Sequence, residues 1–337
     1  MNTKILVTLG PSSLNKKTVE DLSSKGVYLF RINLSHSKLN DLDNLIKKVQ
    51  SWTDTPICLD SEGAQVRNQD MVSEAVQYEE ESFVKIHHEK ILGDSGNISF
   101  TPETVSTQLK VGDVIRVDFD AVQLKVIRKE KKHLLAVVEN GGLVGSNKAT
   151  DINRKIYLDA LTKKDKAAFK IGLENGVSNF SLSFTNKLED VEEIREIIGS
   201  KSNLISKIES IKGVLNLGEI LPAVDQILID RGDLSREVSI DKIPFIQRRI
   251  ISFAKSKDVP VFVATNLLES MVKTISPTRA EVNDVASTLL MGASGLVLAA
   301  ETAIGTYPVE AVNMVNSLIK QYERWTPEST FSDILDN

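Results

Sequence analysis

The sequence contains one cysteine, Cys58, among 337 residues, and aromatic residues make up only 5% of it. A single cysteine cannot form an intramolecular disulfide, and no Cys/His spacing resembles a zinc site. The longest apolar runs, such as residues 295–300, have the length of a strand and are far shorter than the ~18 residues that span a bilayer. The N-terminal apolar stretch is also too short for a signal peptide. These absences predict a soluble, cytoplasmic protein.

Positive charge is not in excess either. Lys and Arg total 41 against 46 Asp and Glu, which gives a net charge of −5. This balance disfavours nucleic-acid binding through attraction of the whole chain to phosphates. Apolar residues make up 41% and charged residues 26%, enough for a sizeable core. The length suggests two domains, or one large α/β domain that carries an insert. Together, the length, composition and charge favour an enzyme.

Short runs rich in Val, Ile and Leu alternate with longer amphipathic segments. A helix is predicted from Thr162 to Asn175, with Gly176 as its stop, and another begins at Pro277-Thr278 and ends at Gly292. Eight buried strands that alternate with helices predict the α/β class and a (β/α)8 TIM barrel. The predicted strands are residues 4–9, 28–34, 56–60, 178–183, 204–208, 226–230, 260–265 and 295–300.

The interval from residue 64 to 148 breaks this alternation. We expect no helix there, because its residues alternate at strand spacing, as in 114–118 and in the hairpin-like pair 122–127 and 133–138. The sequence therefore predicts a small β-barrel domain inserted into the barrel. The barrel is expected to comprise residues 1–63 and 149–325, and residues 326–337 are expected to form a polar, frayed tail.

Polar residues gather where the predicted strands end, which is where (β/α)8 barrels carry their active sites. Polar loops alone would explain scattered Ser and Asn, but not Lys207 and Glu209 within an apolar run, where an isolated charge is costly. Strand alternation would place Lys207 with Glu209, and Arg231 with Asp233, on one side. The other polar residues at strand ends are Arg31, Asn33, Ser35, Asp60, Ser183, Thr265 and Glu301.

Two carboxylates from neighbouring strands, Glu209 and Asp233, suit a hard divalent cation such as Mg²⁺ or Mn²⁺. Lys207 and Arg31 nearby would hold an anion against that metal. A metal, cations and an anion together are the layout of phosphoryl transfer or of enolate stabilisation. The residues alone do not choose between these two reactions.

Six ordered motifs carry a resemblance to a known family. They are Arg31-Ile-Asn-Leu-Ser-His36, Ile205-Ser-Lys-Ile-Glu209, Arg231-Gly-Asp-Leu234, Ala264-Thr-Asn-Leu-Leu-Glu-Ser-Met271, Pro277-Thr-Arg-Ala-Glu281, and Glu301-Thr-Ala followed by Tyr307-Pro-Val-Glu-Ala311. On these motifs the chain resembles the pyruvate kinase family over roughly residues 3–325. The resemblance implies a barrel with an inserted lid domain. It also implies phosphoryl transfer between phosphoenolpyruvate and ADP, with Mg²⁺ and usually K⁺.

The resemblance assigns roles residue by residue. Lys207 would stabilise the transferring phosphoryl group, Arg31 would contact the phosphate, and Thr265 would lie on the path that protonates the enolate. Glu209 and Asp233 would bind Mg²⁺. Small-molecule substrates are implied, with no nucleic acid or membrane, and a homo-oligomer is compatible with the family. The backbone amides of Gly232 and Asp233 would bind the substrate carboxylate, and Arg231 and Asp230 lie at the same place in the chain. The remaining matches are Asn33, Ser35, Asp60 and Ser61 at a monovalent cation, and His36, Arg67 and Lys148 at the nucleotide.

The chain also departs from the family pattern. Glu62 replaces a lysine, and Gln65 replaces an acidic residue that accompanies K⁺ dependence, so the sequence does not assign a K⁺ requirement. Asp230 replaces an alanine where the substrate carboxylate is expected. The family's carboxy-terminal domain is expected to be missing. Two further losses are a Ser-Gly pair that becomes Ala299-Ala300 and an arginine that becomes Asn186.

Three interpretations follow. The first is a short pyruvate kinase. The second is a divergent enzyme on the same scaffold, which uses phosphoenolpyruvate or a related 2-oxo acid in a non-glycolytic biosynthetic pathway. The third is a non-catalytic regulatory module that binds the ligand. Pyruvate formation that depends on ADP separates the first from the others, and binding without turnover favours the third.

Overall fold

The computed structural model describes residues 3–63, 65–118 and 120–335. The chain forms two compact units, one with the residues up to Gly63 and from Lys163 onward, the other with those in between, up to Thr162. The second unit thus ends later than residue 148. The reason is β12 (Ala149–Ile152), which pairs antiparallel with β4 (Val66–Asn68) and β8 (Val114–Val117) of the insert.

The first unit contains a closed barrel of eight parallel strands, in the order β1-β17-β16-β15-β14-β13-β3-β2. This confirms the predicted (β/α)8 barrel. Each strand matches a predicted run to within two residues at either end. The strands are β1 (Lys4–Thr8), β2 (Leu29–Asn33), β3 (Ile57–Asp60), β13 (Asn179–Leu182), β14 (Asn203–Ile208), β15 (Gln226–Asp230), β16 (Val261–Ala264) and β17 (Gly295–Leu298).

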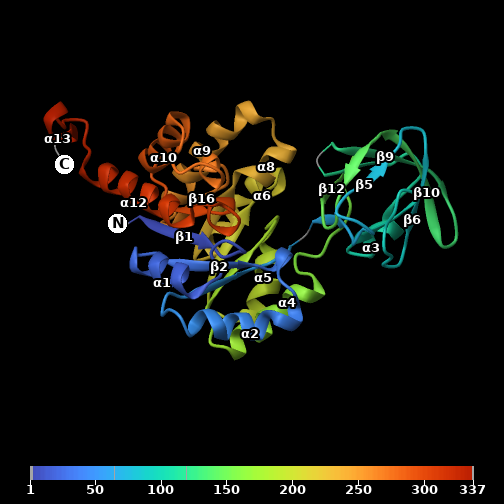
Figure 1. Cartoon of the computed structure of the whole chain (residues 1–337), viewed down its shortest axis with the longest axis horizontal. Coiled ribbons are helices and arrows are strands. Elements are labelled where there is room, and N and C mark those ends of the chain that lie inside the picture. Colours follow the sequence, from blue (N-terminus) through green and yellow to red (C-terminus); the bar gives the residue numbers. More distant parts are fainter. Residues whose placement is uncertain (1–2, 64, 119, 336–337) are drawn as a thin grey trace. The chain divides into compact units, whose positions relative to one another are not determined.

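Helices follow the barrel strands and cover their outer side (Figure 1). The helix predicted to begin at Pro277-Thr278 is present, and Thr278 caps it: its side chain accepts from the Glu281 backbone while the Glu281 carboxylate accepts from Thr278. Gly176 and Gly292 follow their helices with φ of +73° and +97°, as expected of glycine stops. The helices are α1 (Lys16–Ser24), α2 (Leu39–Gln50), α4 (Lys163–Glu174), α5 (Leu188–Ile198), α6 (Ile211–Leu215), α7 (Leu217–Ile220), α8 (Arg231–Glu237), α9 (Ile243–Lys255), α10 (Arg279–Leu290), α11 (Ala300–Ala303) and α12 (Pro308–Arg324), with 3₁₀ turns at Leu34–His36, Leu221–Ala223, Ile240–Lys242 and Glu269–Val272.

The two faces of the barrel strands contact different parts of the first unit. Phe180 on β13 packs edge-on against Phe169 of α4, so its face of the sheet meets the helices. The opposite face points into the barrel, where a buried cluster comprises Leu6, Leu29, Cys58, Ile205, Leu228, Phe262, Ala264 and Val297. Two residues further along the same face of their strands come Arg31, Asp60, Lys207 and Asp230. The barrel interior is therefore apolar below and charged at the carboxyl ends of the strands.

The second unit is a closed barrel of seven strands, in the order β10-β6-β7-β4-β12-β8-β9, with a separate pair β11-β5. The predicted hairpin is confirmed, because β9 (Val122–Lys129) pairs antiparallel with β10 (His133–Asn140). The expectation of no helix was wrong. Helix α3 (Thr104–Gln108) buries Val105 but is too short to show helical periodicity in the sequence. The remaining strands are β5 (Val76–Tyr78), β6 (Phe83–His87), β7 (Asn97–Thr101) and β11 (Gly142–Val144).

Part of the C-terminal tail is ordered as a helix. Helix α13 (Phe331–Leu335) lies in the segment that was expected to be frayed, and it buries none of its residues. Of the helices that the structure describes, none has both the length and the apolar character needed to cross a membrane.

Candidate active site

Lys207 on β14 is the buried centre of the charged layer, with 5% of its side chain exposed. Its Nζ lies 2.8 Å from Glu209 Oε1, 3.1 Å from Ser183 Oγ and 3.4 Å from Asp60 Oδ2. Burial lowers the pKa of Lys207, but the Asp60 and Glu209 carboxylates outweigh it and raise that pKa above the ordinary value. Lys207 is therefore a fixed ammonium group.

Arg31 and Asp60 form a second buried pair at the ends of β2 and β3. Arg31 Nε donates to Asp60 Oδ2 at 2.8 Å, Nη2 donates to the same oxygen, and Nη1 donates to Thr8 Oγ1 at 2.9 Å. Burial acts to raise the pKa of Asp60, but Arg31 and Lys207 together lower it below its usual value. Asp60 thus stays ionised between two cations. The three residues come from the ends of three strands, where the sequence predicts that polar side chains gather.

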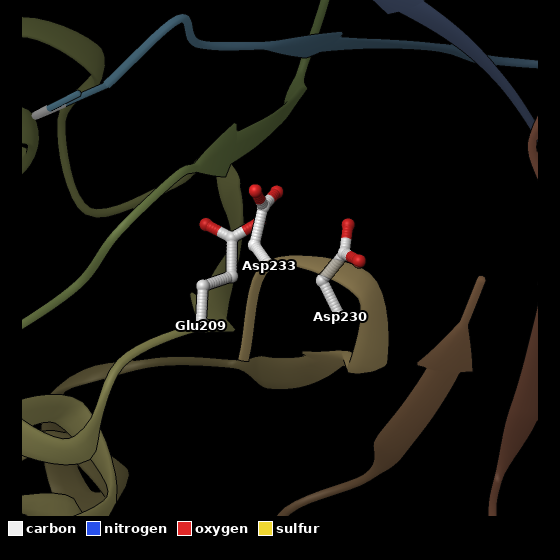
Figure 2. A group of neighbouring side chains, drawn as sticks. All are labelled: Glu209, Asp230 and Asp233. Atoms are coloured by element: carbon white, nitrogen blue, oxygen red, sulfur yellow. The ribbon is translucent and has the colours of Figure 1, made fainter. Parts of the chain in front are cut away.

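Glu209, Asp230 and Asp233 form an acidic cluster, in which one oxygen of each lies within 4.8 Å of the others. Figure 2 shows the three carboxyl groups rising side by side. Glu209 follows β14, Asp230 ends β15, and Asp233 lies in the first turn of α8. Glu209 Oε2 also accepts from the Phe184 amide at 2.6 Å. The sequence grouped Glu209 with Asp233, and the structure adds Asp230 to them.

The electrostatics of this cluster favour a cation. Burial raises the pKa of Glu209 to about 8, and Asp233 and Asp230 add to the rise although Lys207 opposes it. Burial and Asp230 likewise raise the pKa of Asp233, against Lys207 and Arg236. Carboxylates are the donors that Mg²⁺ and Mn²⁺ take, and a dication would offset their mutual repulsion. The residues present therefore fit a hard divalent ion.

Arg231 and Asp233 do not continue the strand as the alternation argument assumed. The chain turns into α8 directly after Asp230, whose Oδ1 accepts from the Gly232 amide at 3.2 Å as an N-cap. Arg231 therefore leaves the face expected for it. Its Nε and Nη2 donate to the Thr265 carbonyl at 3.0 and 2.6 Å, and its Nη1 donates to Asp284 at 2.7 Å.

Thr265 follows β16 and lies against both Asp230 and Gly232. Its hydroxyl donates to Asp230 Oδ1 at 2.6 Å. A Cβ at position 232 would come within 2.8 Å of Thr265 Cγ2, so the close approach of the first turn of α8 to Thr265 favours glycine there. Thr265 is thereby placed at the edge of the acidic cluster.

The residues matched to a monovalent cation lie on neighbouring strands. Asn33 and Asp60 are direct partners in the β2–β3 register. Ser61 comes directly after Asp60, and its carbonyl already accepts from Ser183 Oγ at 2.8 Å. Asn33 Oδ1 accepts from the Ser35 amide at 3.0 Å. A protein cation also reaches this region, because Lys164 Nζ donates to the Leu34 carbonyl at 2.6 Å and to Glu62 at 2.7 Å. The cation assignment stays a prediction.

The three residues matched to the nucleotide fall in different units. His36 ends the turn after β2 in the first unit. In the second unit, Arg67 Nη1 donates to the Asn147 carbonyl at 2.8 Å, and Lys148 Nζ lies 3.0 Å from Asp118. Arg67 and Lys148 are close neighbours there, because Arg67 pairs with Ala149 in the β4–β12 register. Their role toward a nucleotide stays a prediction.

Arg236, Asp284 and Thr8 contact residues of the site but were not predicted from the sequence. Arg236, 3.3 Å from Asp233 Oδ1, could have been found from its position one helical turn later. Asp284 and Thr8 come from distant elements and carry no local signal. Glu301, in contrast, was predicted at a strand end. It is 1% exposed, and its carboxylate accepts from the Leu268 and Ala299 amides at 3.1 and 2.9 Å. It therefore braces two loops of the barrel.

A sequence profile described as the barrel domain of pyruvate kinase matches residues 1–312. The chain belongs to the pyruvate kinase family. It is 33% identical over 332 residues to pyruvate kinase of Thermotoga maritima, an alignment that covers 96% of this chain and 71% of the relative. It is 34% identical over 337 residues to that of Dictyostelium discoideum, and 32% identical over 334 residues to that of Geobacillus stearothermophilus. Each of these two alignments covers 96% of this chain. They cover 66% of the Dictyostelium protein and 57% of the Geobacillus protein.

Proposed function

We propose that this member of the pyruvate kinase family is an Mg²⁺- or Mn²⁺-dependent enzyme that acts on phosphoenolpyruvate or pyruvate, with ADP or ATP as phosphoryl partner. The observation that carries the proposal is the Lys207 ammonium, which is buried 2.8 Å from Glu209 at the edge of the acidic cluster. A fixed cation beside a candidate metal site suits a group that gains negative charge during the reaction.

Glu209 and Asp233 would hold the metal, and the metal would supply charge stabilisation to oxygens of the substrate. Lys207 would face the transferring phosphoryl group. Arg31 would contact the phosphate from the other side of Asp60, which fixes its guanidinium through two hydrogen bonds. Thr265 would hold the proton that the enolate carbon exchanges. K⁺ would be bound by the Asn33 and Asp60 strand ends if the reaction uses it.

Asp230 favours a second candidate, a divergent enzyme on this scaffold that uses phosphoenolpyruvate or a related 2-oxo acid in a non-glycolytic biosynthetic pathway. Its Oδ1 accepts from the Gly232 amide at 3.2 Å, an amide that the family resemblance assigns to the substrate carboxylate. A carboxylate of the protein therefore stands where the substrate carboxylate would bind. It would repel that group, or it would accept a hydrogen bond from a hydroxyl or amine that pyruvate lacks.

Two measurements test the proposal. Isothermal titration with phosphoenolpyruvate, with and without Mn²⁺, should show binding that requires the metal. A failure to bind in both conditions would overturn the proposed function. Coupled pyruvate release from phosphoenolpyruvate and ADP then separates the candidates, because a turnover number in the ordinary range of ~1–10³ s⁻¹ supports the plain kinase. Metal-dependent binding with slow release supports the divergent enzyme.

A further inference from the structure

Thr265 adopts a backbone conformation that β-branched residues rarely take. Its φ is +75°, and that of Asn266, the next residue, is +55°. The left-handed region brings Cβ close to the backbone, and a β-branched side chain makes the crowding worse. Such a conformation persists only where surrounding contacts impose it. The contacts that hold Thr265 are therefore part of what places its hydroxyl.

Arg231 supplies the main contact with this backbone. Two nitrogens of its guanidinium donate to the Thr265 carbonyl, at 3.0 and 2.6 Å. A third, Nη1, donates to Asp284 Oδ2 at 2.7 Å. Asp284 lies on α10, contributes nothing to the acidic cluster, and keeps 37% of its side chain exposed, whereas Arg231 keeps 12%. The guanidinium thus donates to Asp284 from one edge and to the Thr265 carbonyl from the other.

We propose that Asp284 is a positioning residue, which acts through Arg231 to keep the Thr265 hydroxyl beside Asp230. A guanidinium is a rigid planar fork, so a partner on one edge fixes the direction of the opposite edge. Without Asp284, the guanidinium loses the partner that fixes its outer edge, and its two hydrogen bonds to the Thr265 carbonyl weaken. Thr265 then relaxes from its strained conformation.

The conformational claim can be tested without any substrate. In protein carrying ¹³C-labelled threonine methyl groups, the Thr265 peak is identified by its loss in Thr265→Ser. Asp284→Ala should shift that peak, while Asn283→Ala, at the exposed neighbouring position, should leave it in place. An unmoved Thr265 peak in Asp284→Ala would overturn the proposal. If Asp284→Ala does not fold, Asp284→Asn keeps the side-chain size, and a smaller shift in the same direction is expected.

The catalytic consequence rests on the proposed function and needs a reaction that uses Thr265. Exchange of the pyruvate methyl protons for deuterium, followed by NMR in D₂O with Mg²⁺, requires only proton transfer at the enolate carbon. Asp284→Ala should lower the maximal exchange rate by about 10- to 100-fold and leave the pyruvate concentration at half-maximal rate unchanged. In a Thr265→Ala background the same substitution should have no further effect.

Each outcome has one meaning. Equal effects of Asp284→Ala in both backgrounds would show a structural role only and overturn the positioning role. Recovery of exchange in Asp284→Glu, which retains the carboxylate, supports it. No exchange in the unmodified protein counts against the proposed function, and the Thr265 methyl peak then decides the contact chain by itself.

Discussion

The ammonium of Lys207 lies 2.8 Å from the Glu209 carboxylate, and both side chains are almost fully buried. The two residues stand at the end of β14, where one face of the strand turns from apolar to charged. Removing one partner of such a pair leaves the other buried and uncompensated, which is strongly destabilising. Any variant of this pair therefore needs a measurement of folding beside the functional one.

Glu209→Gln is expected to weaken Mn²⁺ binding markedly, because a neutral amide is a poorer ligand for a hard dication. Titration of free Mn²⁺ by electron paramagnetic resonance measures this directly. Glu219→Gln is the matched control, because Glu219 lies on the exposed face of α7. Equal Mn²⁺ affinity in the Glu209 variant and the control would remove this carboxylate from the metal site.

Lys207→Met is expected to reduce turnover of the true substrate by at least about 100-fold, since a fixed donor aimed at developing negative charge contributes ~10²–10³-fold. Lys201→Met, at an exposed position, should leave turnover unchanged. Thermal unfolding of both variants shows whether the fold survives. Near-normal turnover in a folded Lys207→Met protein would refute the role of the ammonium.

The metal-free protein should lose stability as the pH rises from about 4.5 toward about 8. Burial raises the pKa of Glu209 from 4.5 to about 8, so in this window the folded state binds more protons than the unfolded state. The stabilising contribution is complete below the unfolded pKa and is lost as the pH passes the folded pKa. Melting temperatures in EDTA should fall across the window, and Mg²⁺ should offset the fall. A Glu209→Gln variant with the same pH dependence would show that another group causes it.

Asp230→Ala, combined with Ala299→Ser and Ala300→Gly, should raise pyruvate kinase activity. The substitution frees the Gly232 amide and the Thr265 hydroxyl, both of which now donate to Asp230. It also removes a repulsion of roughly 4 kcal/mol for two charges 4 Å apart at an effective dielectric of 20. The assay is coupled pyruvate release from phosphoenolpyruvate and ADP, with and without K⁺. No gain would place the divergence elsewhere, at Glu62, Gln65 or Asn186.

The barrel could be predicted from the sequence because its strands are buried on both faces and read as short apolar runs. The charged layer could be predicted for the same reason. Lys207 and Asp60 interrupt such runs. They lie on the interior face of their strands, two residues after the buried Ile205 and Cys58. A charge at an interior position is costly unless something compensates it, so it marks a site.

Other features depend on contacts that no local pattern encodes. The prediction that the strand continues through Arg231 was wrong, because Asp230 caps helix α8. The spacing of Asp230 and Gly232 in the sequence does not by itself indicate that a helix begins there. The link from Asp284 through Arg231 to Thr265 joins elements far apart in the chain. Helix α3 is too short for its period to appear in the sequence.

A crystal structure with Mn²⁺ and phosphoenolpyruvate would show whether Glu209, Asp233 and Lys207 form one catalytic centre, because anomalous scattering locates the metal without ambiguity. We expect Mn²⁺ to be bound by Glu209 and Asp233, with the ligand's phosphate facing Lys207. Manganese elsewhere in the chain, or phosphoenolpyruvate bound away from Lys207, would contradict it.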